Sequence, residues 1–336
     1  MFDILRKNHI RGNLYKTIMS IYDSVKACIK TSQGVSNVFI CPRGVRQGCS
    51  LSPILFCLFI NELYDMFCSN DIRGIQMFPD ITEIFMLMFD DDVALIADTI
   101  VGLQRQLNIL SEFSLVNKID VNIAKTNIVV FKRGGRLAAS ERWTYRNEPL
   151  TVVNSFSYVG VNFTNRLCMY KMAEHVSSKA KRVLFHVFQT FDYSLCLPYN
   201  TYFKIFDTKI MPILMYGCEL WGNSIMKCIE NIHISACKRF LKVYKNACND
   251  SVLGDLGRFP MYIVSQKRVI KYWLRIVSLP DERYVKKCYN MMKYYDACGH
   301  SNWVTSVRTN LYSNGFGYIW EMQDVQNKLL LFFENV

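Results

Sequence analysis

The spacing of apolar residues predicts helices and short strands in the first part of the chain. Apolar residues recur at near-helical intervals and predict one helix across residues 4–30: Leu5, Ile10, Leu14, Ile18, Ile21 and Val25. SNVFI (36–40) predicts a short strand that leads into a loop with two glycines. We then expect Ser52 as N-cap and Pro53 as first helical residue. The helix that follows, ILFCLFINELYDMF, is apolar on almost every face and is therefore expected to be largely buried.

Two apolar runs, residues 84–89 and 93–98, predict a hairpin of buried strands. Three adjacent carboxylates, Asp90, Asp91 and Asp92, lie at the connection between them. Further along, the pattern predicts a helix (103–118), a strand after Lys125, a flexible joint (133–136), and strands in RWTY and LTVVNSFSYVGVNF separated by the turn RNEP.

From about residue 168 the pattern is helical. The clearest amphipathic helix is 267–277, where Lys267, Lys271 and Arg275 recur every four residues opposite an apolar face. The basic face is either solvated or in contact with nucleic acid, and the pattern does not separate these two interpretations.

Charge adds a partner class to this picture. Residues 1–165 carry 17 basic and 15 acidic side chains, whereas residues 166–336 carry 23 and 13. A second half that is this basic favours a polyanion partner, most simply a nucleic acid. The apolar runs are too short for a membrane span and the N-terminus has no apolar signal core, so we expect a soluble, intracellular protein.

The 13 cysteines do not predict a disulfide scaffold, because their number is odd and no Cys-x-x-Cys occurs. Free thiols in a reducing compartment fit better. The spacing of Cys228, His233 and Cys237 does not match the usual zinc patterns, so we interpret them as core thiols and a surface histidine.

The three aspartates carry the candidate chemistry. Adjacent carboxylates at the tip of a buried hairpin are costly unless a cation neutralises them, and Mg²⁺ favours one or two carboxylates with phosphate oxygens and water. Turns are rich in Asp for other reasons, so the pattern alone also suits an ordinary turn. Three neighbouring stretches favour the catalytic interpretation.

The first of these is GVRQGCSLSP (44–53), where Gln47 and the amide of Gly48 could hold a base or phosphate and Arg46 adds positive charge. The second is Lys125, placed to protonate a leaving pyrophosphate or to stabilise its charge. The third is YVG (158–160), where Tyr158 and Gly160 suit close approach of a backbone.

In this order the motifs resemble the reverse transcriptases of non-LTR (LINE-type) retrotransposons. GVRQGCSLSPILFCLFINEL is similar to the family's RQG…SP motif, FDDD to its F/Y-A-D-D hairpin, NIAKT to its lysine motif and YVG to its primer-grip strand. MPILMYGCELWG and LGDLGRFPMYIVSQKRVIKYWLRI resemble the thumb and the region after it. The resemblance extends from about residue 4 to about residue 320.

The resemblance implies an α+β fold: a partial polymerase palm, an antiparallel sheet with helices, followed by a mostly helical thumb and C-terminal region. We expect a partial fingers and palm domain over residues 1–165, including the primer-grip-like strands, and a helical, basic region over 166–336. The resemblance implies an RNA template, a DNA primer, dNTPs and Mg²⁺ (or Mn²⁺). It makes Asp91 and Asp92 metal ligands, Lys125 catalytic, and Arg46, Gln47 and Gly48 nucleotide- or template-binding.

The chain departs from the family in two ways. Asp90 stands where the family usually has alanine, and it adds repulsion unless it points to the other side of the strand. The family's first catalytic strand, with a further aspartate, is not found upstream of the motifs, and we interpret Asp3 in MFDIL as a look-alike. We therefore expect an N-terminally truncated chain that is catalytically incomplete alone, since two-metal chemistry needs ligands from more than one strand.

Two other interpretations stay open. In the first, the chain is a non-catalytic nucleic-acid-binding remnant that uses its basic helical half. In the second, it is a helical interaction protein whose 267–277 face contacts a protein partner.

Overall fold

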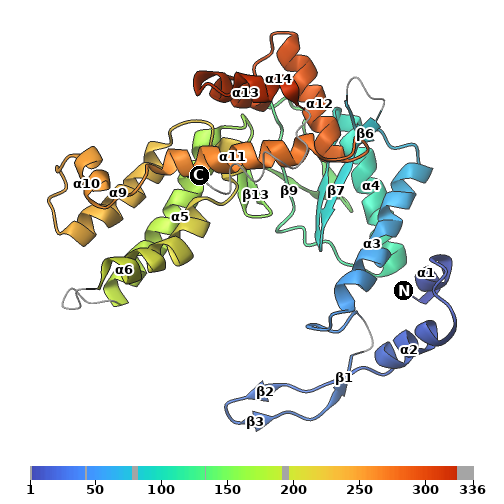
Figure 1. The fold of residues 1–336 in the computed structure, drawn as a ribbon. Helices are drawn as coiled ribbons and strands as arrows, with labels where there is room; N and C mark the ends of the chain where they lie inside the picture. Colours follow the sequence, from blue (N-terminus) through green and yellow to red (C-terminus); the bar gives the residue numbers. More distant parts are fainter. Residues whose placement is uncertain (1, 42–43, 78–81, 133, 191–196, 324–336) are drawn as a thin grey trace. The chain divides into compact units, whose positions relative to one another are not determined.

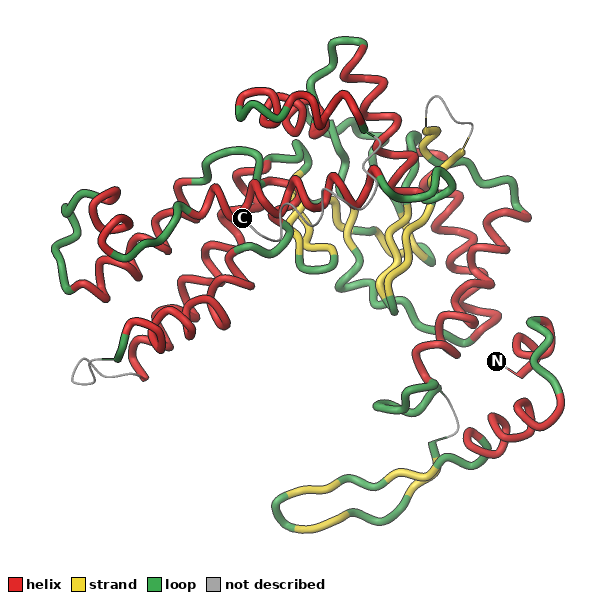
Figure 2. The backbone as a smooth tube through the Cα atoms, viewed as in Figure 1, coloured by secondary structure: helices red, strands yellow, loops and turns green. Residues whose placement is uncertain are grey.

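The computed structural model describes residues 2–41, 44–77, 82–132, 134–190 and 197–323. The described chain combines helices with short strands, most of them in small antiparallel pairs, which agrees with an α+β class. Figure 2 shows the helices as the larger share, above all in the second half of the chain. The chain divides into two compact units, which are described separately below.

Unit 1 comprises residues 1–76, 83–126 and 137–150. Its helices, labelled in Figure 1, are α1 (Phe2–Lys7), α2 (Gly12–Tyr22), α3 (Ser52–Ser69) and α4 (Ile100–Asn117). Its antiparallel strand pairs are β1 (Lys26–Ala27) with β4 (Phe39–Ile40), β2 (Lys30–Thr31) with β3 (Gly34–Val35), β7 (Met86–Phe89) with β8 (Asp92–Leu95), and β10 (Thr144–Tyr145) with β11 (Glu148–Pro149). β5 (Ile75–Met77) pairs with β6 (Thr82–Ile84), and the two units divide within these strands.

The predicted single helix across residues 4–30 is wrong. α1 ends at Lys7, His9 adopts a positive φ of 59°, and α2 begins only at Gly12. α2 ends at Tyr22, and residues 26–40 form a hairpin instead of a continued helix. The spacing of apolar residues continues across this break, because it depends only on the apolar positions and does not register the polar residues at which the helix ends.

Two apolar clusters form the core of unit 1. One joins α3, α4 and Phe85, which precedes β7; its aromatic ring stacks on Tyr64 and Phe67 with centroids 5.3 and 5.7 Å away. The other joins α1, α2 and α3 around Leu5, Ile18 and Leu55. The helix over 52–69 is confirmed, but the prediction that it is largely buried is wrong. Several of its apolar side chains are partly or well exposed, and Ile54 is 59% exposed.

Unit 2 comprises residues 77–82, 127–136 and 151–336. β9 (Asn127–Ile128) pairs in parallel with β12 (Thr151–Val152), and β13 (Ser155–Tyr158) pairs antiparallel with β14 (Val161–Thr164). Helical elements follow: α5 (Met169–Thr190), α6 (Tyr199–Ile205), the π-helix η1 (Phe206–Ile210), α7 (Met211–Leu214), α8 (Cys218–Trp221), α9 (Lys227–Leu241), α10 (Asn249–Asp255), α11 (Met261–Val277), α12 (Tyr284–Ala297), α13 (Trp303–Ser313) and α14 (Gly317–Met322). The boundary predicted after residue 165 stays a prediction; in these units the strands from 151 onward group with the helices.

The amphipathic character predicted for residues 267–277 is confirmed in α11. Val269 and Trp273 are fully buried, while Lys267 and Arg275 are exposed and Lys271 is half-exposed. The buried stripe joins α12, α13 and α14 in one apolar cluster, and α5 to α10 form another. Within the described ranges, no helix has the length and apolar character that crossing a membrane requires.

Candidate active-site residues

The three aspartates lie at the tip of the β7–β8 hairpin in unit 1. Phe89 pairs with Asp92, so Asp90 and Asp91 form a two-residue loop. Asp90 adopts a positive φ of 50°, a conformation that Asp tolerates better than most residues. The sequence thus correctly predicts a tight hairpin with the carboxylates at its connection.

The burial expected for this hairpin is not observed. Asp90, Asp91 and Asp92 are all exposed, and Phe89 beside them is 57% exposed. The cost of burying charge, which we used to infer a cation, therefore does not apply to this tip. Exposure alternates along β7, where Leu87 is also 42% exposed, so one face of this apolar strand is open.

The hairpin is fixed at its base. Gln106 of α4 is fully buried, and its Nε2 donates to the carbonyl oxygen of Ile96 at 2.9 Å and to that of Arg73 at 3.3 Å. The amide of Ile96 donates to the carbonyl of Phe85 at 2.8 Å, which extends the strand ladder away from the tip. The rigid end of the hairpin is thus the end remote from the aspartates.

Residues 46–49 form a tight turn before α3. The amide of Cys49 donates to the carbonyl of Arg46 at 3.3 Å, and Gly48 has a φ of +80°, which only glycine adopts without strain. Arg46, Gln47 and Gly48 are all exposed. The turn therefore presents the predicted binding residues to solvent.

Ser52 does not cap the helix as predicted. Its hydroxyl is buried and donates to the carbonyl of Arg46 at 2.5 Å, and it also bonds the Tyr22 hydroxyl at 2.9 Å. Ser52 thus holds the 46–49 turn, while Leu51 is the N-cap of α3 and makes no side-chain cap. Sequence reasoning missed Tyr22 because it lies 30 residues away from Ser52.

The Cys49 thiol shares this network. Backbone hydrogen bonding at Leu51, followed by the hydrogen bond with Tyr22, lowers the pKa of Cys49 below its ordinary value. Burial raises the pKa of Tyr22. Cys49 is a free thiol that is partly exposed and lies directly after Gly48.

Lys125 lies in a turn over residues 122–126, directly before β9. Its amide donates to the carbonyl of Asn122 at 3.1 Å and to the Asn122 side chain at 3.2 Å, and the residue itself is exposed. Lys125 belongs to unit 1, as do Arg46, Gln47, Gly48 and the aspartates.

Tyr158 and Gly160 belong to unit 2, on the β13–β14 hairpin. Tyr158 pairs with Val161, so Val159 and Gly160 form the loop, with φ values of 46° and 77°. The Tyr216 hydroxyl donates to the carbonyl of Val159 at 2.6 Å. Tyr216 lies 57 residues away, and sequence reasoning did not identify it.

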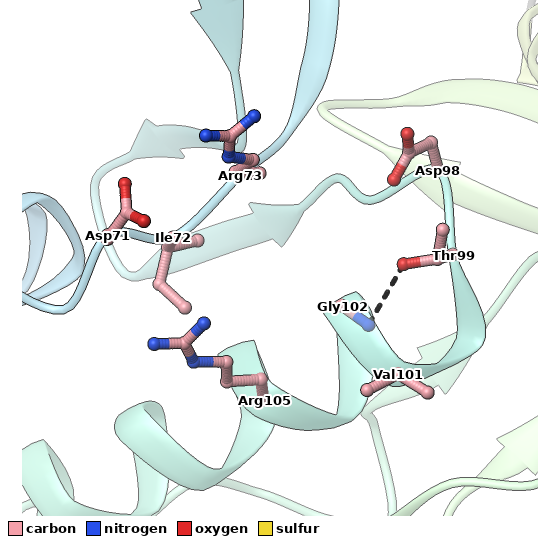
Figure 3. A pocket seen from close by; sticks show the side chains of 8 residues that line it. All are labelled: Asp71, Ile72, Arg73, Asp98, Thr99, Val101, Gly102 and Arg105. Carbon is pink, nitrogen blue, oxygen red and sulfur yellow. Dashed lines mark hydrogen bonds between the residues drawn. The ribbon is translucent and has the colours of Figure 1, made fainter.

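A pocket of about 230 Å³ with a mixed polar and apolar lining lies at the N-terminus of α4 in unit 1. Figure 3 shows the side chains of Arg73, Arg105 and Asp98 around it, and the Thr99 hydroxyl accepting a hydrogen bond from the Gly102 amide at 3.1 Å. The remaining lining residues are Asp71, Ile72 and Val101. None of the residues predicted from the sequence lines it.

Cys228, His233 and Cys237 do not form a metal site. His233 is fully buried, which corrects its prediction as a surface residue, and its Nε2 accepts a hydrogen bond from Arg258 Nε at 2.9 Å. Burial, with the Arg258 charge, lowers the pKa of His233 to about 3. Within the part of the chain that the structure describes, no group of three His, Cys, Asp or Glu side chains is arranged to hold a metal ion.

Asp3, interpreted as a look-alike for a catalytic aspartate, lies in helix α1 and not in a strand. Its side chain is 90% exposed and lies 4.0 Å from Arg6.

Comparison with known proteins identifies what residues 9–163 are similar to. They match the family model for reverse transcriptase (RNA-dependent DNA polymerase). The match contains the 46–48 turn, the aspartate hairpin, Lys125 and the YVG turn.

Three curated relatives are similar over longer stretches. The probable RNA-directed DNA polymerase from transposon X-element of Drosophila melanogaster is 22% identical over 255 residues, covering 70% of this chain and 26% of the relative. The Pol polyprotein from the type-1 retrotransposable element R2 of Popillia japonica is 24% identical over 228 residues (65% and 35%). The RNA-directed DNA polymerase from mobile element jockey of Drosophila funebris is 22% identical over 251 residues (70% and 26%). The chain thus spans about a quarter to a third of the length of these relatives.

Proposed function

This chain is a reverse-transcriptase-like protein of the non-LTR retrotransposon type, and we propose that it takes part in RNA-directed DNA synthesis. In this role it binds an RNA template, a DNA primer and dNTPs. The observation that carries the proposal is the exposed Asp91–Asp92 pair, which occurs in one compact unit with the 46–48 turn and Lys125 and within the family match. Residues 1–165 then act as a partial fingers and palm domain, and residues 166–336 as a thumb-like and C-terminal region.

The aspartate pair fits Mg²⁺ in the presence of substrate. Mg²⁺ keeps several waters and binds one or two carboxylates together with substrate phosphates, which an exposed pair on a hairpin tip permits. Asp91 and Asp92 are the proposed ligands, and Mn²⁺ suits the same oxygens. When bound, the ion stabilises negative charge that develops on the transferred phosphate.

The other residues have proposed roles set by their placement. Gln47 and the amide of Gly48 bind the nucleotide or template, and Arg46 neutralises phosphate charge. Lys125 donates a proton to the leaving pyrophosphate or stabilises its charge. Tyr158 and Gly160 contact the primer strand.

Nucleotide selection tests this proposal without requiring catalysis. A labelled RNA template with a DNA primer of recessed 3′ end is bound to the full chain, with Mg²⁺ and each dNTP in turn. We expect the dNTP complementary to the template to slow dissociation of the complex about tenfold relative to the other three. Equal effects of all four dNTPs would contradict template-directed polymerisation.

We further propose that the chain alone does not complete the catalytic metal site. Asp3 lies in a helix, and two-metal chemistry needs ligands from more than one strand. In a primer-extension assay with Mg²⁺ or Mn²⁺ we therefore expect no elongation. Robust synthesis that Asp91→Ala abolishes would overturn this proposal while supporting the role of the pair.

The second candidate is a nucleic-acid-binding protein without catalysis. The basic excess after residue 165, with Lys267 and Arg275 exposed on α11, favours it. Affinity for single-stranded RNA should then fall steeply with salt, since each neutralised phosphate releases counterions. Binding that depends on salt but not on dNTP or primer favours this candidate, and binding that is flat with salt removes it.

A further inference from the structure

The YVG turn has a backbone that its sequence does not explain. Two-residue hairpin loops with positive φ at both positions favour Asn-Gly or Asp-Gly. Here Val159 takes the first position with a φ of 46°, and for a β-branched side chain this conformation is a strained outlier. Strain of this kind persists only where surrounding contacts enforce it. Gly160, with a φ of 77°, fits the second position.

Tyr216 supplies the enforcing contacts. Its hydroxyl donates to the carbonyl oxygen of Val159 at 2.6 Å. Its ring lies against Gly160 so closely that a Cβ there would be 3.0 Å from Tyr216 Cε1 and 3.2 Å from the hydroxyl oxygen. Glycine is therefore required at position 160 both by its φ and by the aromatic ring beside it.

A second glycine makes the contact reciprocal. Gly217 has a φ of 66°, and a Cβ there would lie 3.2 Å from Val161 Cγ2 on β14. The hairpin and the corner between α7 and α8 thus approach each other through one glycine from each side. An alanine at either position would require the facing side chain to shift by a few tenths of an ångström and would itself adopt a strained positive φ.

The corner that carries Tyr216 is fixed in the core of unit 2. Met215 and Cys218 on either side of it are fully buried, and the amide of Cys218 donates to the carbonyl of Met215 at 3.2 Å. Trp221 Nε1 donates to the carbonyl of Tyr216 at 3.3 Å. The backbone of Tyr216 is therefore held by the helical core, while its side chain extends to the turn. As a whole, the residue is 46% exposed.

We infer that Tyr216 is a positioning residue that fixes the 158–160 turn and thereby sets where the 3′ end of a primer strand meets it. The primer part of this inference rests on the proposed function. The family match ends at residue 163, so Tyr216 lies outside the matched region. Within unit 2 it joins the corner between α7 and α8 to β13 and β14, the last strands of the match.

Tyr216→Phe tests this inference because it removes one hydroxyl and keeps the ring. The full chain is bound to an RNA template and a DNA primer whose 3′-terminal nucleotide is 4-thiothymidine, and photo-crosslinks are mapped by peptide mass spectrometry. We expect wild type to crosslink within residues 158–160. In Tyr216→Phe that yield should fall about fivefold at saturating protein, while total affinity for the duplex stays within twofold. Tyr244→Phe is the matched control, since Tyr244 is 86% exposed, and should leave both quantities unchanged.

The outcomes separate the inference from the function on which it rests. If wild type crosslinks at 158–160 and Tyr216→Phe does so equally, the inference is wrong and the proposed function stands. If wild type does not crosslink there, the primer role of the turn fails, and the inference fails with it. If Tyr216→Phe loses crosslinking and total binding to the same extent, Tyr216 is only structural.

A double-variant cycle tests the contact itself. Gly160→Ala and Tyr216→Ala each disturb the same interface, so their combined loss of crosslinking should not exceed the larger single loss. Losses that multiply would show that the two residues act independently and would overturn the inference.

Discussion

The two hairpins that carry candidate residues are fixed at opposite ends. In unit 1 the β7–β8 hairpin is held at its base by Gln106 and Phe85, and its aspartate tip is exposed. In unit 2 the tip of the β13–β14 hairpin is itself bound, by Tyr216. A tip that recruits a metal ion together with substrate phosphate must be open to solvent. A turn that guides a polymer strand must instead be fixed in place, and the difference in anchoring matches these two proposed roles.

The largest effect should come from removing the carboxylates at the open tip. We expect Asp91→Asn or Asp92→Asn to abolish the slowing of dissociation by Mg²⁺ and the complementary dNTP, which is about tenfold in the wild type, because these two residues are the proposed ligands of the ion. Asp90→Asn is the matched control and should change retention less than about threefold, as expected for a carboxylate that is not a ligand. Dissociation rates measured over a Mg²⁺ titration give the result. Equal losses for all three variants would reduce the tip to an acidic turn.

Anchoring at the base predicts a stability effect confined to unit 1. Gln106→Met keeps the volume but leaves the carbonyls of Ile96 and Arg73 without their buried donor, which should cost about 2 kcal/mol. Hydrogen exchange of peptides from residues 85–96, followed in urea, measures it. Val116→Met, at a position 72% exposed on the same helix, should change stability by less than about 0.5 kcal/mol. Loss of protection in β13–β14 peptides as well would contradict separate anchoring.

Acid should loosen the anchor of the second hairpin. The His233 ring packs against Phe206 of the core that also holds Met215 and Cys218, and its pKa in the fold is lowered to about 3. The unfolded chain, with a pKa near 6.5, binds this proton more readily than the folded chain does. Above about pH 6.5 His233 therefore makes no contribution to the pH dependence of the free energy of unfolding. As pH falls below that, it lowers this free energy increasingly, by about 2 kcal/mol at pH 5.

Tryptophan fluorescence during urea unfolding at pH 7 and pH 5 measures this effect, because four of the five tryptophans belong to unit 2. His233→Gln should keep an acceptor for Arg258 and remove about one proton from the pH dependence. A variant whose pH dependence equals that of wild type would show that His233 does not titrate on unfolding. Acid would then not be expected to loosen the anchor of the β13–β14 hairpin more than that of the β7–β8 hairpin.

Local pattern was sufficient for some elements and for the order of the motifs. Three elements were predicted correctly: the amphipathic α11, the helix after the aspartates and the tight Asp hairpin. Each is formed by residues that lie close together in the sequence. The family match over residues 9–163 agrees with the motifs found by reading. The roles assigned to Asp91, Asp92 and Lys125 stay predictions.

What failed depends on contacts between residues far apart in sequence. Exposure of the aspartate tip was missed because apolar strand letters do not tell which face another element covers. Burial of His233 depends on Arg258, 25 residues away, and the bond from Ser52 to Tyr22 spans 30. The sequence signal for Tyr216 was the glycine that follows it, since a glycine can mark a place where another backbone approaches closely.

The smallest effect compares strain at the two tips directly. Val159 and Asp90 each occupy the first loop position with positive φ, 46° and 50°. The left-handed conformation costs an L-residue about 1–2 kcal/mol, but Asp is tolerated there through local hydrogen bonding. Glycine relieves this strain and loses about 0.5–1 kcal/mol in chain entropy. Val159→Gly should therefore stabilise by about 0.5–1 kcal/mol, and Asp90→Gly by about zero.

Urea unfolding followed by hydrogen exchange of each hairpin gives both values. Val153→Gly is the matched control, because Val153 lacks a positive φ and should lose about 1 kcal/mol. The carbonyl that Tyr216 binds belongs to the backbone, so the bond survives in Val159→Gly. The effect of the Tyr216 hydrogen bond can thus be separated from the effect of the backbone strain at position 159. If Val159→Gly instead destabilises the hairpin, the valine side chain contributes packing that outweighs its strain, and Tyr216 would not be enforcing an unfavourable conformation.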